Sequence, residues 1–286
     1  MLYILLSILF FTGIFLIFKI IGKQNVSTIN IIVVNYLFAA ILGNIQSQES
    51  PLNAITQDWL YMAIIIGLLF FIFFIIIGIS TKLVGLSVTT VASKMSVIIP
   101  IIFSIIYYNE LITFFKIVGI ILAIIGVSLT VYKKADAEQK TKLSEFLIPL
   151  LLFIGMGFTD LLFKFSQHKY ITENNIALFN SSLFYISFFS SLIYVFIKKE
   201  GHHLFNKKTL YYGALLGLFN YFGVFFFMKA LSSNTLDSSV VFGINNVSIV
   251  ILSVLIGLII FKEKINKINI MGIISAITAI IFLSVS

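Results

Sequence analysis

The stretch LYMAIIIGL, Leu60–Leu68, returns 150 residues later as LYYGALLGL, Leu210–Leu218. Both copies begin with Leu-Tyr, end with Gly-Leu and lie within long apolar runs. An apolar run of about 18 residues or more predicts a transmembrane helix. Because self-similarity at a fixed distance indicates internal duplication, the pair predicts two copies of one membrane-spanning unit.

Two further pairs of segments support the duplication. FLIFKI (Phe15–Ile20) matches DLLFKF (Asp160–Phe165) at an offset of 145 residues. NELITFFKIVGI (Asn109–Ile120) matches KEKINKINIMGI (Lys262–Ile273) at an offset of 153. The offset grows slowly along the chain, as small loop insertions would make it grow, so a true repeat explains the matches better than chance.

The composition is that of an integral membrane protein. Hydrophobic residues make up 60% of the 286 and charged residues only 10%, whereas about a quarter of the residues of a soluble domain are charged. We therefore predict an all-α membrane protein with ten transmembrane helices. The predicted spans are 2–22, 27–46, 58–80, 84–107, 111–132, 145–166, 174–197, 209–230, 236–261 and 267–285.

The ten spans divide into two repeats of five. We predict a first repeat over residues 1–132, a polar linker over 133–144 and a second repeat over 145–286. Since five is odd, the second repeat enters the membrane from the opposite side. Inverted repeats of this kind are typical of secondary transporters, which bind substrate near the midplane and work by alternating access.

Several motifs resemble a known family. GLSVTTVASKMSVIIP (Gly85–Pro100) has small residues leading to a proline, Glu110 is followed by Gly119 and Gly126, and Glu263 is followed by Gly272 in the second repeat. The sequence resembles the drug/metabolite transporter superfamily, specifically its EamA-type ten-helix members. The resemblance implies a multi-pass transporter of a bacterial inner membrane, working as a monomer or a homodimer.

Lys94 is the most informative charged residue. It lies about ten residues into the fourth predicted span, ~15 Å deep at 1.5 Å per residue. A lysine facing lipid at this depth costs ~2.5–3.5 kcal/mol, so Lys94 should face the bundle interior or a water-filled cavity. One interpretation is structural: helix carbonyls accept hydrogen bonds from Lys94, or its amine is held neutral. The other is functional: Lys94 binds an anionic group of the substrate or a coupling proton. Lys19, Lys82 and Lys229 lie near span ends, where lysine side chains reach the headgroups.

Asp160 is the acid that lies well inside a predicted span. Lys164 follows four residues later, so the two share a helix face and can form an ion pair. The alternative is that Asp160 titrates and couples transport to protons. Both residues are therefore candidates for ion coupling.

Asn35, Asn180, Asn220, Asn245 and Asn246 all fall within predicted spans, and an amide in hydrocarbon needs hydrogen-bond partners. Interhelical bonds or substrate contacts would supply them. The repeat places Asn35 and Asn180 at equivalent positions, and it sets Lys94 against Asn245 and Asn246 across the pseudo-two-fold axis. The candidate substrate-binding residues are Lys94, Asn35, Asn180, Asn220, Asn245 and Asn246.

The sequence favours a secondary transporter for a small polar metabolite, anionic or zwitterionic. We find no GxxxxGK[ST], HExxH or GxSxG motif, so we expect neither an enzyme nor an ATP-driven pump, and we expect no metal or other cofactor. The expected partners are the substrate, the lipid bilayer and protons, and not nucleic acid. An exporter of hydrophobic cations and a membrane scaffold without transport activity are the alternatives.

Overall fold

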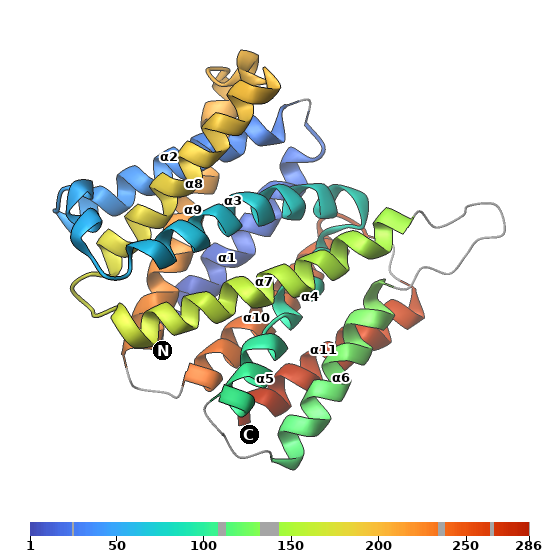
Figure 1. Ribbon diagram of the computed structural model, residues 1–286. Coiled ribbons are helices and arrows are strands. Elements are labelled where there is room, and N and C mark those ends of the chain that lie inside the picture. Colours follow the sequence, from blue (N-terminus) through green and yellow to red (C-terminus); the bar gives the residue numbers. More distant parts are fainter. Residues whose placement is uncertain (25, 108–112, 132–142, 234–237, 264–265, 286) are drawn as a thin grey trace. The chain divides into compact units, whose positions relative to one another are not determined.

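The computed structural model describes residues 1–24, 26–107, 113–131, 143–233, 238–263 and 266–285 (Figure 1). These residues form helices and connecting turns, without β-strands in the part described, which confirms the predicted all-α class. The helices are α1 (Leu2–Ile21), α2 (Thr28–Ser47), η1 (Pro51–Thr56), α3 (Leu60–Leu83), α4 (Leu86–Met95), α5 (Ile98–Tyr107), α6 (Phe114–Val131), α7 (Leu143–Tyr170), α8 (Ile176–Lys198), η2 (Gly201–His203), α9 (Lys207–Ser232), α10 (Ser238–Ile259) and α11 (Lys267–Val285).

Length and apolarity make this chain a multi-pass membrane protein. Among the described residues, seven helical segments are long and apolar enough to cross a bilayer: those of α1, α2, α3, α7, α8, α9 and α10. Three shorter apolar stretches lie at Leu86–Pro100, Ile117–Gly126 and Lys267–Phe282. The count of ten spans and the inverted arrangement of the repeats therefore stay predictions.

The prediction of one continuous fourth span over 84–107 is wrong. Two ten-residue helices, α4 and α5, occupy this stretch, and Ser96 and Val97 form a turn between them. Pro100 explains the interruption, because its ring would clash with the carbonyl of Ser96 in a continuous helix and it has no N–H to donate. The N–H of Ile99 donates to the Ser96 carbonyl instead, at 2.9 Å.

The chain folds into two compact units. The first comprises Met1–Gly78 and Leu162–Asn234, and the second comprises Ile79–Leu161 and Thr235–Ser286. Each unit takes segments from both predicted repeats. The predicted boundaries of the repeats are not tested by this division, and most of the predicted linker, like Glu110, lies outside the described residues.

In the first unit, α2 packs against α8 and α9, and α1 packs against α9. Glycines bring the backbones close together. A Cβ atom on Gly43 would lie 3.0 Å from Ser181, and one on Gly217 would lie 2.6 Å from the Asn35 carbonyl oxygen. The hydroxyl of Ser181 donates to the Ala40 carbonyl at 3.2 Å. This close packing fixes the backbone on which Asn35, Asn180 and Asn220 lie.

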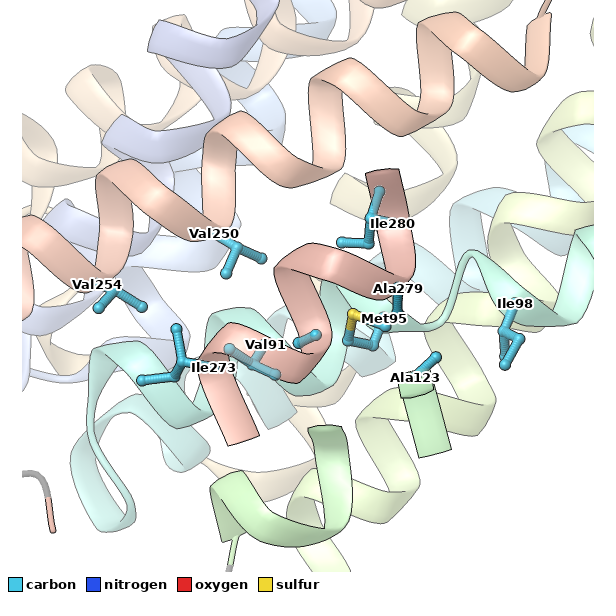
Figure 2. Packing of buried hydrophobic residues seen from close by; sticks show 10 residues of the cluster. Val91, Met95, Ile98, Ala123, Val250, Val254, Ile273, Ala279 and Ile280 are labelled. Carbon is cyan, nitrogen blue, oxygen red and sulfur yellow. The ribbon is translucent and has the colours of Figure 1, made fainter. Parts of the chain in front are cut away.

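In the second unit, α6 packs along α11. A Cβ atom on Gly126 would lie 2.8 Å from the backbone nitrogen of Ala276, and the hydroxyl of Ser275 donates to the Leu122 carbonyl at 2.9 Å. Ala123 and Ala276 are fully buried, as expected for small residues that let helices approach closely. Figure 2 shows the core of this unit, in which side chains of α4, α6, α10 and α11 meet.

Candidate functional site

Lys94 lies in the last turn of α4, directly before the turn that separates α4 from α5. Val91 and Met95, on either side of it in the same helix, are buried in the core of the second unit (Figure 2). Lys94 itself is partly buried. The carbonyl end of a helix carries partial negative charge, so the end of α4 is a favourable place for an ammonium group.

Asp160, which lies in α7, is close to the turn that follows α4. Its carboxylate interacts electrostatically with the ammonium of Lys94. The hydroxyl of Ser96, which is buried, also donates to Asp160 Oδ2 at 3.3 Å. Gly157 permits this approach, because a Cβ atom there would lie 2.8 Å from the Ser96 carbonyl oxygen. The helix break thus brings together a cation, an acid and a hydroxyl.

The partnership of Lys94 with Asp160 was not expected from the sequence. Sequence spacing indicated only Lys164 as a partner of Asp160, because those two residues lie four apart on one helix. Lys164 is partly buried in α7, and the structure adds Lys94 to the surroundings of the acid. This electrostatic interaction joins residues 66 positions apart, which spacing within one helix cannot indicate.

Asn245 and Asn246 lie in α10, the helix that packs against α4. Both side chains are almost fully buried, with 1% and 4% of their surface exposed. No hydrogen-bond partner of Asn246 Nδ2 is found among the described residues. The two amides therefore stay candidates for substrate binding, and their expected position opposite Lys94 stays a prediction.

Asn35 and Asn220 meet in the first unit. Asn220 Nδ2 donates to Asn35 Oδ1 at 3.2 Å, which joins α9 to α2, and both residues are buried. Asn35 Nδ2 has no partner among the described residues. The bond supports a structural role for this pair, and leaves the two N–H donors of Asn35 Nδ2 for a ligand or a water molecule.

Asn180 differs from Asn35, although the predicted repeat places them at equivalent positions. Its side chain is fully buried, and neither amide atom has a hydrogen-bond partner among the described residues. With the offset of 150 residues, the equivalent of Asn220 is Phe70, so the repeat supplies no amide to meet Asn180. A buried amide without a partner is costly, and such a group is often explained by a bound molecule.

Over the described ranges, no three His, Cys, Asp or Glu side chains are grouped closely enough to hold a metal ion. A lysine, a carboxylate and a hydroxyl can together bind a small ionic molecule, or exchange a proton with it.

Comparison with known proteins agrees with this architecture. The model of the EamA-like transporter family matches residues 1–132. The match confirms the resemblance to EamA-type members of the drug/metabolite transporter superfamily over residues 1–132. They are also the residues of the first predicted repeat.

Two similar proteins cover nearly the whole chain. A Haemophilus influenzae protein described only as uncharacterized is 26% identical over 287 residues, which cover 97% of this chain and 95% of that protein. A protein of known crystal structure superposes with a TM-score of 0.62 at 12% identity, covering 99% of this chain and 96% of the other. The second likeness shows a shared fold and nothing about the substrate.

Proposed function

We propose that this protein is a secondary transporter that moves a small polar metabolite, anionic or zwitterionic, by alternating access. The observation that carries the proposal is the hydrogen bond from Ser96 to Asp160 at the break between α4 and α5, two residues from Lys94, whose charge also acts on Asp160. Ionisable residues within membrane helices are costly and mark substrate or ion pathways. Interrupted helices are typical of transporter binding sites.

The pair determines which ligands suit the site. A carboxylate or phosphate group of a substrate would compete with Asp160 for the ammonium of Lys94. A zwitterion would engage both residues at once, because its cationic group would take the place of Lys94 beside Asp160. A proton bound by Asp160 would release Lys94 for an anion, and this is a direct way to couple proton and substrate movement.

Binding by the purified protein tests the substrate class. Thermal unfolding would be followed with amino acids, dicarboxylates, sugar phosphates, neutral sugars and organic cations, because a ligand that binds the folded state raises the midpoint. We expect anions or zwitterions to stabilise the protein. A charge-assisted hydrogen bond contributes about 1.5–3 kcal/mol, so Lys94→Met should weaken their binding about ten- to a hundredfold.

The matched control is Lys82→Met. Lys82 lies in the last turn of α3 and is exposed, so its replacement should leave binding unchanged. Each shift is measured from the ligand-free midpoint of the same variant, which separates binding from stability. If Lys94→Met binds every ligand found as tightly as the parent does, the proposed role of Lys94 is wrong.

A second candidate function is export of hydrophobic cations. The first unit contains a group of neighbouring aromatic side chains, in which Phe163 lies 6.4 Å from both Phe70 and Phe227 by ring centroids. Aromatic faces attract cations. These rings pack against one another, however, and the charge of Lys94 already acts on Asp160, so we favour the anionic or zwitterionic substrate. Stabilisation by organic cations alone would reverse this choice, and no stabilisation by any class would favour a scaffold without transport.

A further inference from the structure

Glu263 makes a contact that the proposed substrate site does not use. It follows the end of α10, and its carboxylate receives three hydrogen bonds from the first residues of α4. The N–H of Leu86 donates to Oε1 at 2.6 Å, and the N–H and the hydroxyl of Ser87 donate to Oε2 at 3.2 and 2.8 Å. A carboxylate at a helix N-terminus satisfies donors that have no partner within the helix.

The backbone around Glu263 holds the carboxylate in this position. Lys262 has a φ of +52°, and the N–H of Glu263 donates back to the Gly257 carbonyl at 2.9 Å. A Cβ atom on Gly257 would lie 2.7 Å from both Glu263 Oε2 and the Ser87 hydroxyl. The contact of Glu263 with α4 thus depends on the left-handed backbone of Lys262, and on the absence of a side chain at Gly257.

The helix that Glu263 holds is short and is interrupted at both ends. Gly85, with a φ of +95°, precedes α4, and the turn at Ser96 and Val97 follows it. Ten residues at 1.5 Å each give a rod of about 15 Å. Since Glu263 is bonded to the first turn and Lys94 lies in the last, the position of Lys94 along the helix axis follows from the contact of Glu263.

We propose that Glu263 is a positioning residue for Lys94. Its carboxylate fixes the N-terminus of α4, and loss of this contact frees the helix to carry Lys94 away from Asp160 during the transport cycle. The second part rests on the proposed transport function. The first concerns the resting structure alone, and it can be tested without a substrate.

A cysteine placed at Val97 reports on the release of α4. The chain has no cysteine of its own, and Val97 is 2% exposed at the turn that follows α4. Labelling of Val97→Cys by N-ethylmaleimide would be timed in detergent, with Glu263 intact and with Glu263→Ala or Glu263→Gln. Loss of charge-assisted hydrogen bonds should raise the labelling rate about ten- to a hundredfold in Glu263→Ala. Glu263→Gln, which keeps one amide oxygen as acceptor, should give a smaller increase.

Two controls separate positioning from general loosening. Ala279, in α11, is fully buried. A cysteine at this position should therefore not react with N-ethylmaleimide in any Glu263 variant. Glu173→Ala removes an exposed acid that lies 3.9 Å from Lys229 in the first unit, and should not change labelling at position 97. An unchanged rate at position 97 in Glu263→Ala would overturn the proposal. So would an equal increase at position 279, because Glu263 would then stabilise the unit as a whole.

Discussion

The charge pair of Lys94 and Asp160 is the central feature at the scale of single residues. Each residue is partly buried, and replacing either one alone would remove an opposite charge that acts on the other. Removing one partner of a pair in a poorly hydrated place costs more than removing both. The pair therefore links the stability of the protein to the proposed binding site.

A double-mutant cycle measures that link. Lys94→Met and Asp160→Asn should each lower the midpoint of thermal unfolding, and the double variant should recover part of the loss. We expect a coupling free energy of about 0.5–3 kcal/mol, the range found for residues in contact. The same cycle with Lys82→Met in place of Lys94→Met should show no coupling. Additive losses in the first cycle would mean that the two charges do not act as a pair.

The asymmetry of Asn35 and Asn180 gives a second prediction at this scale. Asn35→Leu leaves Asn220 without its acceptor, and an orphaned buried donor costs about 1–3 kcal/mol. Asn180→Leu removes an amide that has no partner in the described structure, so stability should stay the same or rise. Thermal unfolding of the two ligand-free variants compares them directly. A loss for Asn180→Leu as large as that for Asn35→Leu would show that Asn180 also has a structural bond.

At the scale of elements, the interruption between α4 and α5 places the site. In a continuous helix, the backbone groups of Lys94 and Ser96 would take part in regular helical hydrogen bonds. The turn instead leaves Lys94 at a helix end and lets the Ser96 hydroxyl reach Asp160. We infer that the break is needed for the proposed binding site, although it weakens the helix.

Replacement of Pro100 separates the effect of the break on ligand binding from its effect on stability. Pro100→Ala supplies an N–H that can donate to the Ser96 carbonyl and removes the clash of the ring, which favours one continuous helix. The variant should unfold at the same or a higher temperature, yet bind the ligand found for the parent more weakly. Unchanged binding together with unchanged stability would show that the break does not depend on Pro100 and would leave its role in binding unsupported.

The sequence predicts helices well because long apolar runs identify them. The predicted span 27–46 is close to α2 (Thr28–Ser47), and 174–197 is close to α8 (Ile176–Lys198). The sequence does not predict the break in the fourth span, because apolarity continues across Pro100. The electrostatic interaction of Lys94 with Asp160 and the contact of Glu263 with α4 depend on tertiary packing between distant segments, which local patterns do not encode. The recurrence of a glutamate in NELI and KEKI was the one signal that pointed to Glu263.

At the scale of the whole molecule, the distribution of lysines predicts an orientation. Fourteen lysines lie near the loops that follow the odd-numbered predicted spans, and four lie on the other side: Lys116, Lys164, Lys169 and Lys229. Lysine-rich loops stay in the cytoplasm. The loop 133–142, which lies outside the described residues, is therefore expected to be cytoplasmic, with both termini outside.

Labelling of a single cysteine tests this orientation. Ala135→Cys introduces a thiol into a chain that has none. A membrane-impermeant thiol reagent should fail to label it in intact cells and should label it after the membrane is opened. Rapid labelling in intact cells would reverse the orientation without affecting the account of the site.

Uptake into sealed liposomes tests the central claim most directly. The purified protein would be reconstituted with no nucleotide present, and entry of the anionic or zwitterionic ligand identified by thermal unfolding would be measured with and without a proton gradient. We predict uptake by the parent and by Lys82→Met, and at least about tenfold slower uptake by Lys94→Met at low substrate concentration. Uptake by Lys94→Met as fast as by the parent, or no uptake by the parent of a ligand that it binds, would contradict the account.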